Sequence, residues 1–197
     1  MKYLFVIAMK KEAKSIIKHY NLEKIDDNYY KKDNIELIIT EMSRNGITST
    51  LINLLYKYNL DYRDYIMINV GVAGSNNLKI NDVYIVNKSY GYNFDLTLFN
   101  TPLYEGIMSP YEMDMIEGYK STNCYTSDSF VTKTDIKEDA LFDMELNMII
   151  TFPFKKKYSI KVVSDSLSNH EYGNFNFDKD LDKVFRITDK IIALKWI

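Results

Sequence analysis

Apolar and polar positions follow one another along the chain in blocks that predict strands and helices in alternation. Residues 2–8 form a nearly continuous apolar run, which is typical of a strand buried on both faces of a parallel sheet. Apolar residues recur at helical spacing over 10–20 and again over 47–58, so two amphipathic helices are expected there. Another apolar strand is expected over 65–72. This order is rich in β-α-β units and indicates an α/β fold.

The rest of the pattern adds a hairpin, more strands and a C-terminal helix. The hairpin is expected over 28–41, where two strand-like runs are separated by a short Asp-Asn turn. Further strands are expected at 82–90, at the start of 123–131 and at 157–165. Residues 100–122 hold two prolines and little periodicity, which predicts a loop with one short helix around 111–118. From Asp178 onward, apolar residues mark one face of a final helix.

The stretch NVGVAGSNN (69–77) follows an apolar run and is interpreted as a strand that leads into a glycine turn. Backbone N–H groups at such a turn can cradle an anion. However, the stretch contains no basic residue and matches neither GxxxxGK[ST] nor GxGxxG, so the two common phosphate-binding motifs are excluded. The turn is therefore expected to serve another kind of ligand.

Bulk composition favours one domain and gives no sign of a polyanionic partner. The 197 residues contain no repeat and no Pro/Gly/Ser-rich linker, so a single domain over 1–197 is expected. The 25 Lys and Arg residues nearly balance the 27 Asp and Glu residues, for a net charge of −2. This balance favours neither nucleic acid nor an anionic membrane as a partner.

Cysteine and histidine usage argues against a disulfide framework and against a metal site. The single cysteine, Cys124, cannot form an internal disulfide. His19, His170 and Cys124 share no metal-ligand spacing, so neither a metal nor another cofactor is expected. The apolar run at the start of the chain is too short for a signal peptide or a membrane span, and charged residues follow it at once. A cytoplasmic protein is expected.

Acidic residues stand at or just after several expected strand ends. Glu12 closely follows the first strand, Glu145 closes the triplet 143–145, and Asp165 ends the last strand. In open α/β sheets, ligands bind beyond the carboxyl ends of the strands. We therefore expect three carboxylates to converge on one crevice, with no lysine or arginine among them. Such a crevice suits a neutral substrate that becomes cationic during reaction.

Each of these residues, taken alone, also has an ordinary structural explanation. Glu12 could simply complement the helix dipole, Asp165 could cap a turn, and Met9 could be a core residue. Glu145 could be an exposed acid on a helix, although its neighbours are apolar and an unpaired buried acid is costly. Their order along the chain is what favours a functional interpretation.

Five stretches carry a resemblance to a known family. They are AMKKEA (8–13), INVGVAGSNNLKINDVYIV (68–86), TSDSFV (126–131), DMEL (143–146) and VVSDS (162–166). In this order, the chain resembles the nucleoside phosphorylase superfamily, most closely the 5′-methylthioadenosine/S-adenosylhomocysteine nucleosidases. These enzymes cleave the N-glycosidic bond of adenine nucleosides with water. The resemblance implies a three-layer α/β/α fold with a central mixed, largely parallel sheet, a purine nucleoside as ligand, and a homodimer.

The resemblance also implies catalytic roles for individual residues. Asp165 would protonate N7 of the purine, and Ser164 would help to hold Asp165. Glu12 would orient and deprotonate the attacking water, while Glu145, with Met144, would bind the ribose hydroxyls. Asp165 would need a raised pKa, for which repulsion among neighbouring carboxylates is one source.

The base and ribose contacts follow in the same way. Phe130 and Val131 would flank and recognise the purine, and Met9 would border the ribose. Asn69 and Gly71, in the glycine stretch, would shape the ribose pocket. Phosphorylases of the superfamily carry an arginine at the position of Asn69. Asn69 and the carboxylate of Glu12, which would repel a phosphate dianion, therefore favour water as the nucleophile.

Two alternatives to a hydrolase stay open. Arg44 lies near the turn 44–46 and could recruit phosphate, which would make the protein a phosphorylase. Val72 and Leu146 depart from the small residues usual in the family, and the loops around 126–131 are shorter than typical. These departures leave room for a protein that binds nucleosides without turnover.

Overall fold

The computed structural model describes residues 1–40, 44–92 and 110–194. The strands are β1 (Lys2–Ile7), β2 (Glu23–Asp26), β3 (Tyr29–Lys32), β4 (Ile35–Ile39), β5 (Tyr65–Ser75), β6 (Val83–Gly91), β7 (Tyr111–Glu112), β8 (Ser121–Thr126), β9 (Ala140–Asp143) and β10 (Lys156–Asp165). The main helices are α1 (Lys10–His19), α2 (Arg44–Lys57), α4 (Leu146–Ile149), α5 (Asn169–Asn174), α6 (Phe177–Asp180) and α7 (Phe185–Ala193). None of the helices in these ranges is both long enough and apolar enough to cross a membrane.

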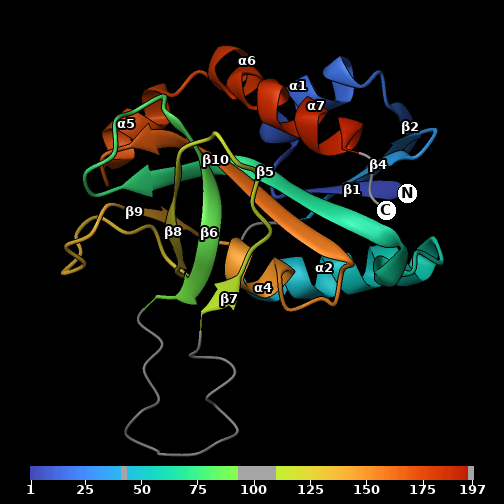
Figure 1. Ribbon diagram of the computed structural model, residues 1–197, viewed down its shortest axis with the longest axis horizontal. Helices are drawn as coiled ribbons and strands as arrows, with labels where there is room; N and C mark the ends of the chain where they lie inside the picture. Colours follow the sequence, from blue (N-terminus) through green and yellow to red (C-terminus); the bar gives the residue numbers. More distant parts are fainter. Residues whose placement is uncertain (41–43, 93–109, 195–197) are drawn as a thin grey trace, which may run out of the picture.

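One mixed sheet forms the centre of the fold. Its parallel core runs β4-β1-β5-β10, and the hairpin of β2 and β3 extends it beyond β4. Strand β10 also pairs with β6, β6 with β8, β8 with β9, and β9 with the end of β5. These pairings close the strands β5, β10, β6, β8 and β9 into a ring at one end of the sheet (Figure 1).

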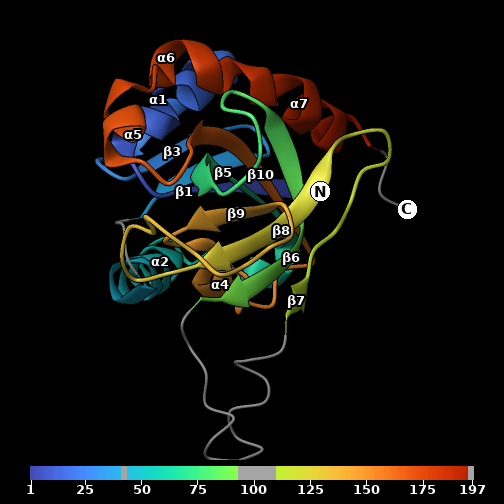
Figure 2. The ribbon, with the colours of Figure 1, turned by 90° about the vertical axis from the view of Figure 1, so that its left-hand side faces the viewer.

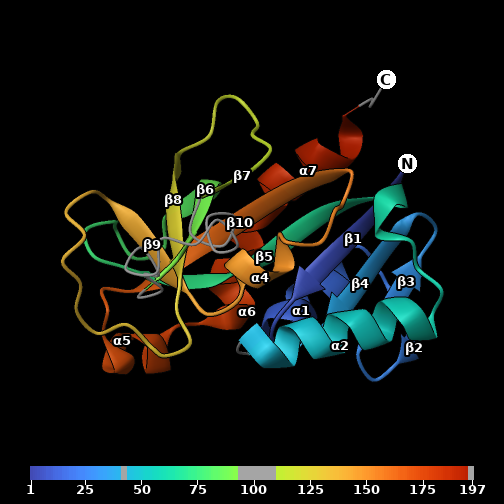
Figure 3. The same ribbon diagram turned by 90° about the horizontal axis from the view of Figure 1, so that it is seen from below.

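Helices cover both faces of the sheet, which makes the expected three-layer α/β/α arrangement. Helices α1, α6 and α7 lie on one side, and α2 and α4 lie on the other, as Figures 1 and 2 show. Figure 3 views the molecule from the side of α2. The expected α/β fold with a mixed sheet is therefore confirmed.

Strand β1 shows why its sequence is apolar throughout. Tyr3, Phe5 and Ile7 point into the core on the side of α1 and α7. Leu4 and Val6 point into the core on the side of α2 and α4. Because both faces are covered, apolar side chains are favoured at both sets of positions.

Most expected elements are confirmed, including the first strand, the first two helices and the hairpin. The prediction of a short helix around 111–118 is wrong. Tyr111 and Glu112 form β7 against β6, and Asp114 is hydrogen-bonded to the backbone of Lys157. The C-terminal helix is broken into α6, a 3-10 turn (Leu181–Val184) and α7. Strand β2 and helix α5 were not expected, and part of the loop at 100–122 lies outside the described residues.

The prediction of a glycine turn within residues 69–77 is also wrong, because β5 continues as a strand to Ser75. Gly71 pairs with Lys161 of β10, and Gly74 pairs with Asp165. Neither glycine has a positive φ. A glycine inside a strand often marks a close approach of neighbouring groups rather than a turn.

Ile68 lies in β5 at the centre of the sheet and is completely buried. Ile68→Ala should lower the free energy of unfolding by about 2–5 kcal/mol, because it leaves a cavity between close-packed layers. Urea unfolding followed by circular dichroism measures the change. Ile52→Ala is the matched control, because Ile52 is half exposed on α2 and should change the stability by about 0.5 kcal/mol at most. Equal effects of the two substitutions would contradict the position given to Ile68.

Candidate active site

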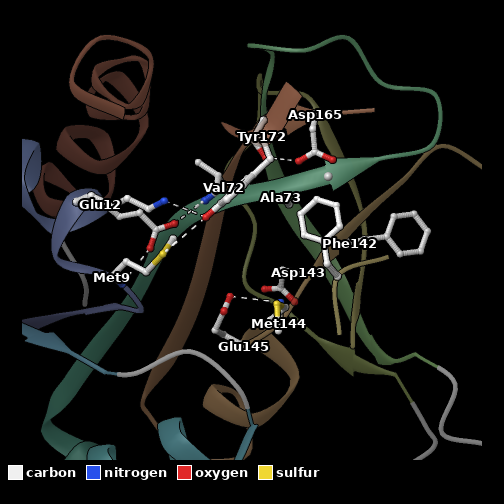
Figure 4. Close-up of a pocket in the computed structure, with 14 residues that line it drawn as sticks. Met9, Glu12, Val72, Ala73, Phe142, Asp143, Met144, Glu145, Asp165 and Tyr172 are labelled. Atoms are coloured by element: carbon white, nitrogen blue, oxygen red, sulfur yellow. Dashed lines mark hydrogen bonds between the residues drawn. The ribbon is translucent and has the colours of Figure 1, made fainter. Parts of the chain in front are cut away.

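A cavity of about 350 Å³ opens where β1, β5, β9 and β10 end (Figure 4). Its walls are formed by Met9, Lys11, Glu12, Val72, Ala73, Gly74, Phe130, Phe142, Asp143, Met144, Glu145, Ser164, Asp165 and Tyr172. The cavity thus brings together residues from six separate parts of the chain. Seven of the ten residues expected from the sequence line it: Met9, Glu12, Phe130, Met144, Glu145, Ser164 and Asp165.

Glu12 is fixed by two backbone N–H groups. Its Oε1 accepts a hydrogen bond from Val72 N (3.0 Å), and its Oε2 accepts one from Met9 N (3.1 Å). The second bond caps the start of α1. Burial raises the pKa of Glu12, and the nearby ammonium of Lys161 and the two N–H groups oppose that rise. The carboxylate is therefore held in a single orientation at the edge of the cavity.

Asp165 is placed by an irregularity in β10. The pairing with β5 shifts between Val163 and Asp165, so Ser164 is an extra residue and Asp165 lies opposite Gly74. Ser164 Oγ donates to Asp165 Oδ2 (2.7 Å), and Ser168 N donates to Oδ1 (3.1 Å). The pKa of Asp165 is raised, as expected, but the main cause is burial rather than repulsion by the other cavity carboxylates.

The two glycines of β5 make room for these acids. A Cβ on Gly71 would lie 3.1 Å from Glu12 Oε1 and 3.5 Å from Lys161 Nζ. A Cβ on Gly74 would lie only 2.8 Å from Asp165 Oδ1, closer than real contacts allow. Gly74 is therefore required for Asp165 to hold its position. Gly71 stands behind Glu12 and is not one of the cavity residues.

A buried ion pair joins Asp143, in the cavity wall, to Lys161 behind it. Lys161 Nζ is 2.8 Å from Asp143 Oδ2, and both side chains are almost completely buried. Burial alone would lower the pKa of Lys161, but the carboxylates of Asp143 and Glu145 outweigh it and raise that pKa. The expectation that the acids meet without a lysine is wrong. A lysine inside an apolar strand was the sequence signal that could have revealed this pair, because a buried charge requires a partner.

Glu145 follows β9 and is 8% exposed. Burial, with the negative charge of Asp143, raises the pKa of Glu145 to about 8. The ammonium of Lys161 and the N–H group of Met144 (3.3 Å from Oε2) act in the opposite direction. Glu145 can therefore be protonated near neutral pH, unlike an exposed glutamate.

Aromatic residues form the apolar walls. Phe130 contacts the ring of Tyr172 edge to face, with centroids 5.7 Å apart. Tyr172 comes from α5 and also lies 3.8 Å from Met9 Sδ through its hydroxyl. Val131 lines a smaller hollow of about 30 Å³ beside Phe130 and Asp165. Tyr172 was missed by the sequence analysis, although Ser168 and Glu171 form the S-x-x-E pattern of a helix start.

Asn69 does not line the cavity. Its side chain donates from Nδ2 to Val6 O (2.9 Å) and accepts at Oδ1 from Ser159 Oγ (2.9 Å). These bonds join β5 to β1 and β10 behind the cavity wall. Among the described residues, no group of three or more His, Cys, Asp or Glu side chains is arranged to hold a metal ion.

The fold is that of known nucleosidases. A Streptococcus pneumoniae MTA/SAH nucleosidase in complex with 8-aminoadenine matches with a TM-score of 0.80 and 18% identity, over 98% of this chain and 100% of that chain. The futalosine hydrolase of Helicobacter pylori matches with a TM-score of 0.78 and 17% identity, over 98% and 97% of the two chains. A mutant of the Helicobacter pylori MTAN with 5′-methylthioadenosine in its active site matches with a TM-score of 0.77 and 16% identity, over 97% of each chain.

The structural similarity is not accompanied by a detectable similarity in sequence. No protein-family model matches the chain, and no curated protein matches it by sequence. At 16–18% identity, the structural likeness shows the fold and not the activity. The chain therefore has the fold class that the sequence resemblance implied, with a cavity at the strand ends.

The raised pKa of Glu145 makes a prediction about stability. Its pKa in the folded protein, about 8, exceeds the ordinary value of 4.5, so its contribution is fully present below about pH 4.5 and is lost as the pH rises through 8. Wild type should therefore lose about 2–5 kcal/mol more stability between pH 5 and pH 9 than Glu145→Gln, which cannot ionise. Urea unfolding at the two pH values measures this. Glu23→Gln, on an exposed residue, should behave like wild type; a Glu145→Gln profile parallel to wild type would contradict the assignment.

Proposed function

We propose that the protein is a purine nucleosidase that hydrolyses the N-glycosidic bond of 5′-methylthioadenosine/S-adenosylhomocysteine-type or futalosine-type nucleosides. The observation that carries the proposal is that Glu12, Glu145 and Asp165, from three separate strand ends, line one cavity. Such a site stabilises positive charge, and cleavage of the glycosidic bond places positive charge on the ribose ring.

Asp165 is the general acid in this proposal. Its raised pKa favours the protonated form, which can donate a proton to N7 of the purine. Ser164 and the N–H group of Ser168 hold the carboxyl group while the proton leaves. Protonation makes the purine a better leaving group, so the bond to the ribose weakens. Phe130 and Val131, next to Asp165, flank the base.

Glu12 and Glu145 act on the ribose side. Glu12 orients a water molecule toward the anomeric carbon and takes its proton, while the backbone N–H groups of Val72 and Met9 keep the carboxylate in place. Glu145 binds the ribose hydroxyls, with Met144 beside it, and Met9 borders the ribose. Asn69 and Gly71 contribute from behind the wall by fixing β5 and by leaving room for Glu12.

The charge of the cavity favours water over phosphate as the nucleophile. Four carboxyl groups line it, from Glu12, Asp143, Glu145 and Asp165; the ammonium of Lys161 is already paired with Asp143, and the ammonium of Lys11 lies beside Tyr172. Glu145 and Asp165 can be protonated, but the carboxylate of Glu12, which would hold the nucleophile, would repel a phosphate dianion. The side chain of Arg44 lies outside the described part of the chain. A homodimer that serves methionine salvage belongs to the same proposal and is supported by the sequence resemblance. A cytoplasmic location and the absence of a cofactor belong to it as well and are supported by the cysteine and histidine usage of the chain.

Adenine release from 5′-methylthioadenosine, with and without phosphate, tests the proposal. Release should not depend on phosphate, and Asp165→Asn and Glu12→Gln should each slow it by about 10²–10⁴-fold, because each removes a proton-transfer group. Release can be followed by chromatography of the free base.

Asp33→Asn and Glu23→Gln are the matched controls, because both residues are exposed and stand outside the cavity. Release that requires phosphate and yields ribose 1-phosphate would make the protein a phosphorylase instead. Binding of purine nucleosides without any release would make it a nucleoside-binding protein.

A further inference from the structure

Lys11 is the one cationic side chain among the described residues that line the cavity. Its Nζ donates a hydrogen bond to Tyr172 OH (3.0 Å) and lies 4.0 Å from the ring centre of Phe177. Among the described residues it forms no ion pair, although its charge opposes the rise in the pKa of the neighbouring Glu12. An exposed lysine that is not engaged in an ion pair, at the rim of a cavity lined by acids, is available to a ligand.

The proposed function fixes which part of a nucleoside would reach Lys11. With purine N7 at Asp165 and the ribose hydroxyls at Glu145, C4′ of the ribose lies on the side away from the base. Figure 4 shows Met9 and Glu12 on the opposite side of the cavity from Asp165. Lys11 adjoins Glu12 on α1 and contacts Tyr172, whose hydroxyl reaches Met9 Sδ. The substituent at C5′ would therefore leave the cavity past Met9 and Lys11.

We propose that Lys11 makes the site selective for nucleosides whose 5′ substituent carries a carboxylate, over those with a neutral 5′ group. This inference rests on the proposed function. An ammonium group has three N–H donors, and the bond to Tyr172 uses one of them, so a carboxylate can bind while Tyr172 stays in place. The aromatic rings of Tyr172 and Phe177 limit where the ammonium can move.

A neutral and an anionic substrate, measured on the same enzymes, test this inference. The probes are 5′-methylthioadenosine and 5′-(2-carboxyethylthio)adenosine. Wild type should favour the carboxylate probe in kcat/KM by about threefold to tenfold, because a partly exposed charge pair gives a modest preference. Lys11→Met should lose this preference, and Lys11→Arg should keep most of it. Added salt should weaken it in wild type.

Lys10→Met is the matched control. Lys10 is also exposed, lies in the same first turn of α1 and does not line the cavity, so its removal changes the net charge equally and should leave the preference intact. An unchanged preference in Lys11→Met, or an equal loss in Lys10→Met, would overturn the inference. A purely structural role, in which Lys11 only holds Tyr172, would slow both probes by the same factor and would overturn it too.

Two further results separate this inference from its alternatives. If added phosphate speeds wild type but not Lys11→Met, the anion at Lys11 is free phosphate and the inference fails. Turnover of 5′-methylthioadenosine by wild type tests the proposed function independently of the role of Lys11. If neither probe is turned over, the preference is measured instead as the ratio of the dissociation constants of the two probes, for wild type, Lys11→Met and Lys10→Met. A ratio that does not change with Lys11 overturns the inference in that case as well.

Discussion

Strand β5 runs beside β10 with Gly71 opposite Lys161 and Gly74 opposite Asp165, and the rest of the site is built around these two pairs. In each pair, the absence of a Cβ lets a charged side chain occupy the space beside the strand. At Gly74 the space is taken by the carboxylate of Asp165, and at Gly71 it is shared by Glu12 and Lys161. Any larger residue at Gly74 would displace the acid at the end of β10.

The electrostatics of the site follow from this packing. Several carboxyl groups are buried close together, which is costly unless they are protonated or paired. Lys161 and Asp143 form the paired part of the cluster, and backbone N–H groups hold Glu12. Glu145 keeps a raised pKa because the ammonium of Lys161 does not fully offset its burial and the negative charge of Asp143. Asp165 keeps a raised pKa because its hydrogen bonds to Ser164 and to the backbone of Ser168 do not fully offset its burial. Burial thus lowers stability at high pH through Glu145 and favours the protonated form of Asp165, the acid of the proposed chemistry.

Local patterns in the sequence predicted the individual strands and helices better than the contacts that form the site. Apolar runs and helical spacing located β1, α1 and the hairpin, because those signals come from neighbouring residues. The glycine stretch was interpreted as a turn because glycine locally favours turns. The reason for its glycines is the pairing with β10, about ninety residues later in the chain, which no local pattern reveals. The helix at 111–118 failed for a similar reason, since pairing with β6 and the bond of Asp114 to Lys157 outweigh local preference. Lys161 and Tyr172 acquire their positions only in the folded chain.

The most direct test of this account is the rate of adenine release by Gly74→Ala, measured on 5′-methylthioadenosine beside wild type and Gly173→Ala. Gly173 has open space around its missing side chain, so its substitution should leave the rate unchanged. The account predicts that Gly74→Ala slows release by about 10²-fold or more, because the new methyl group displaces the carboxylate of Asp165. A Gly74→Ala protein that is as active as wild type would contradict it.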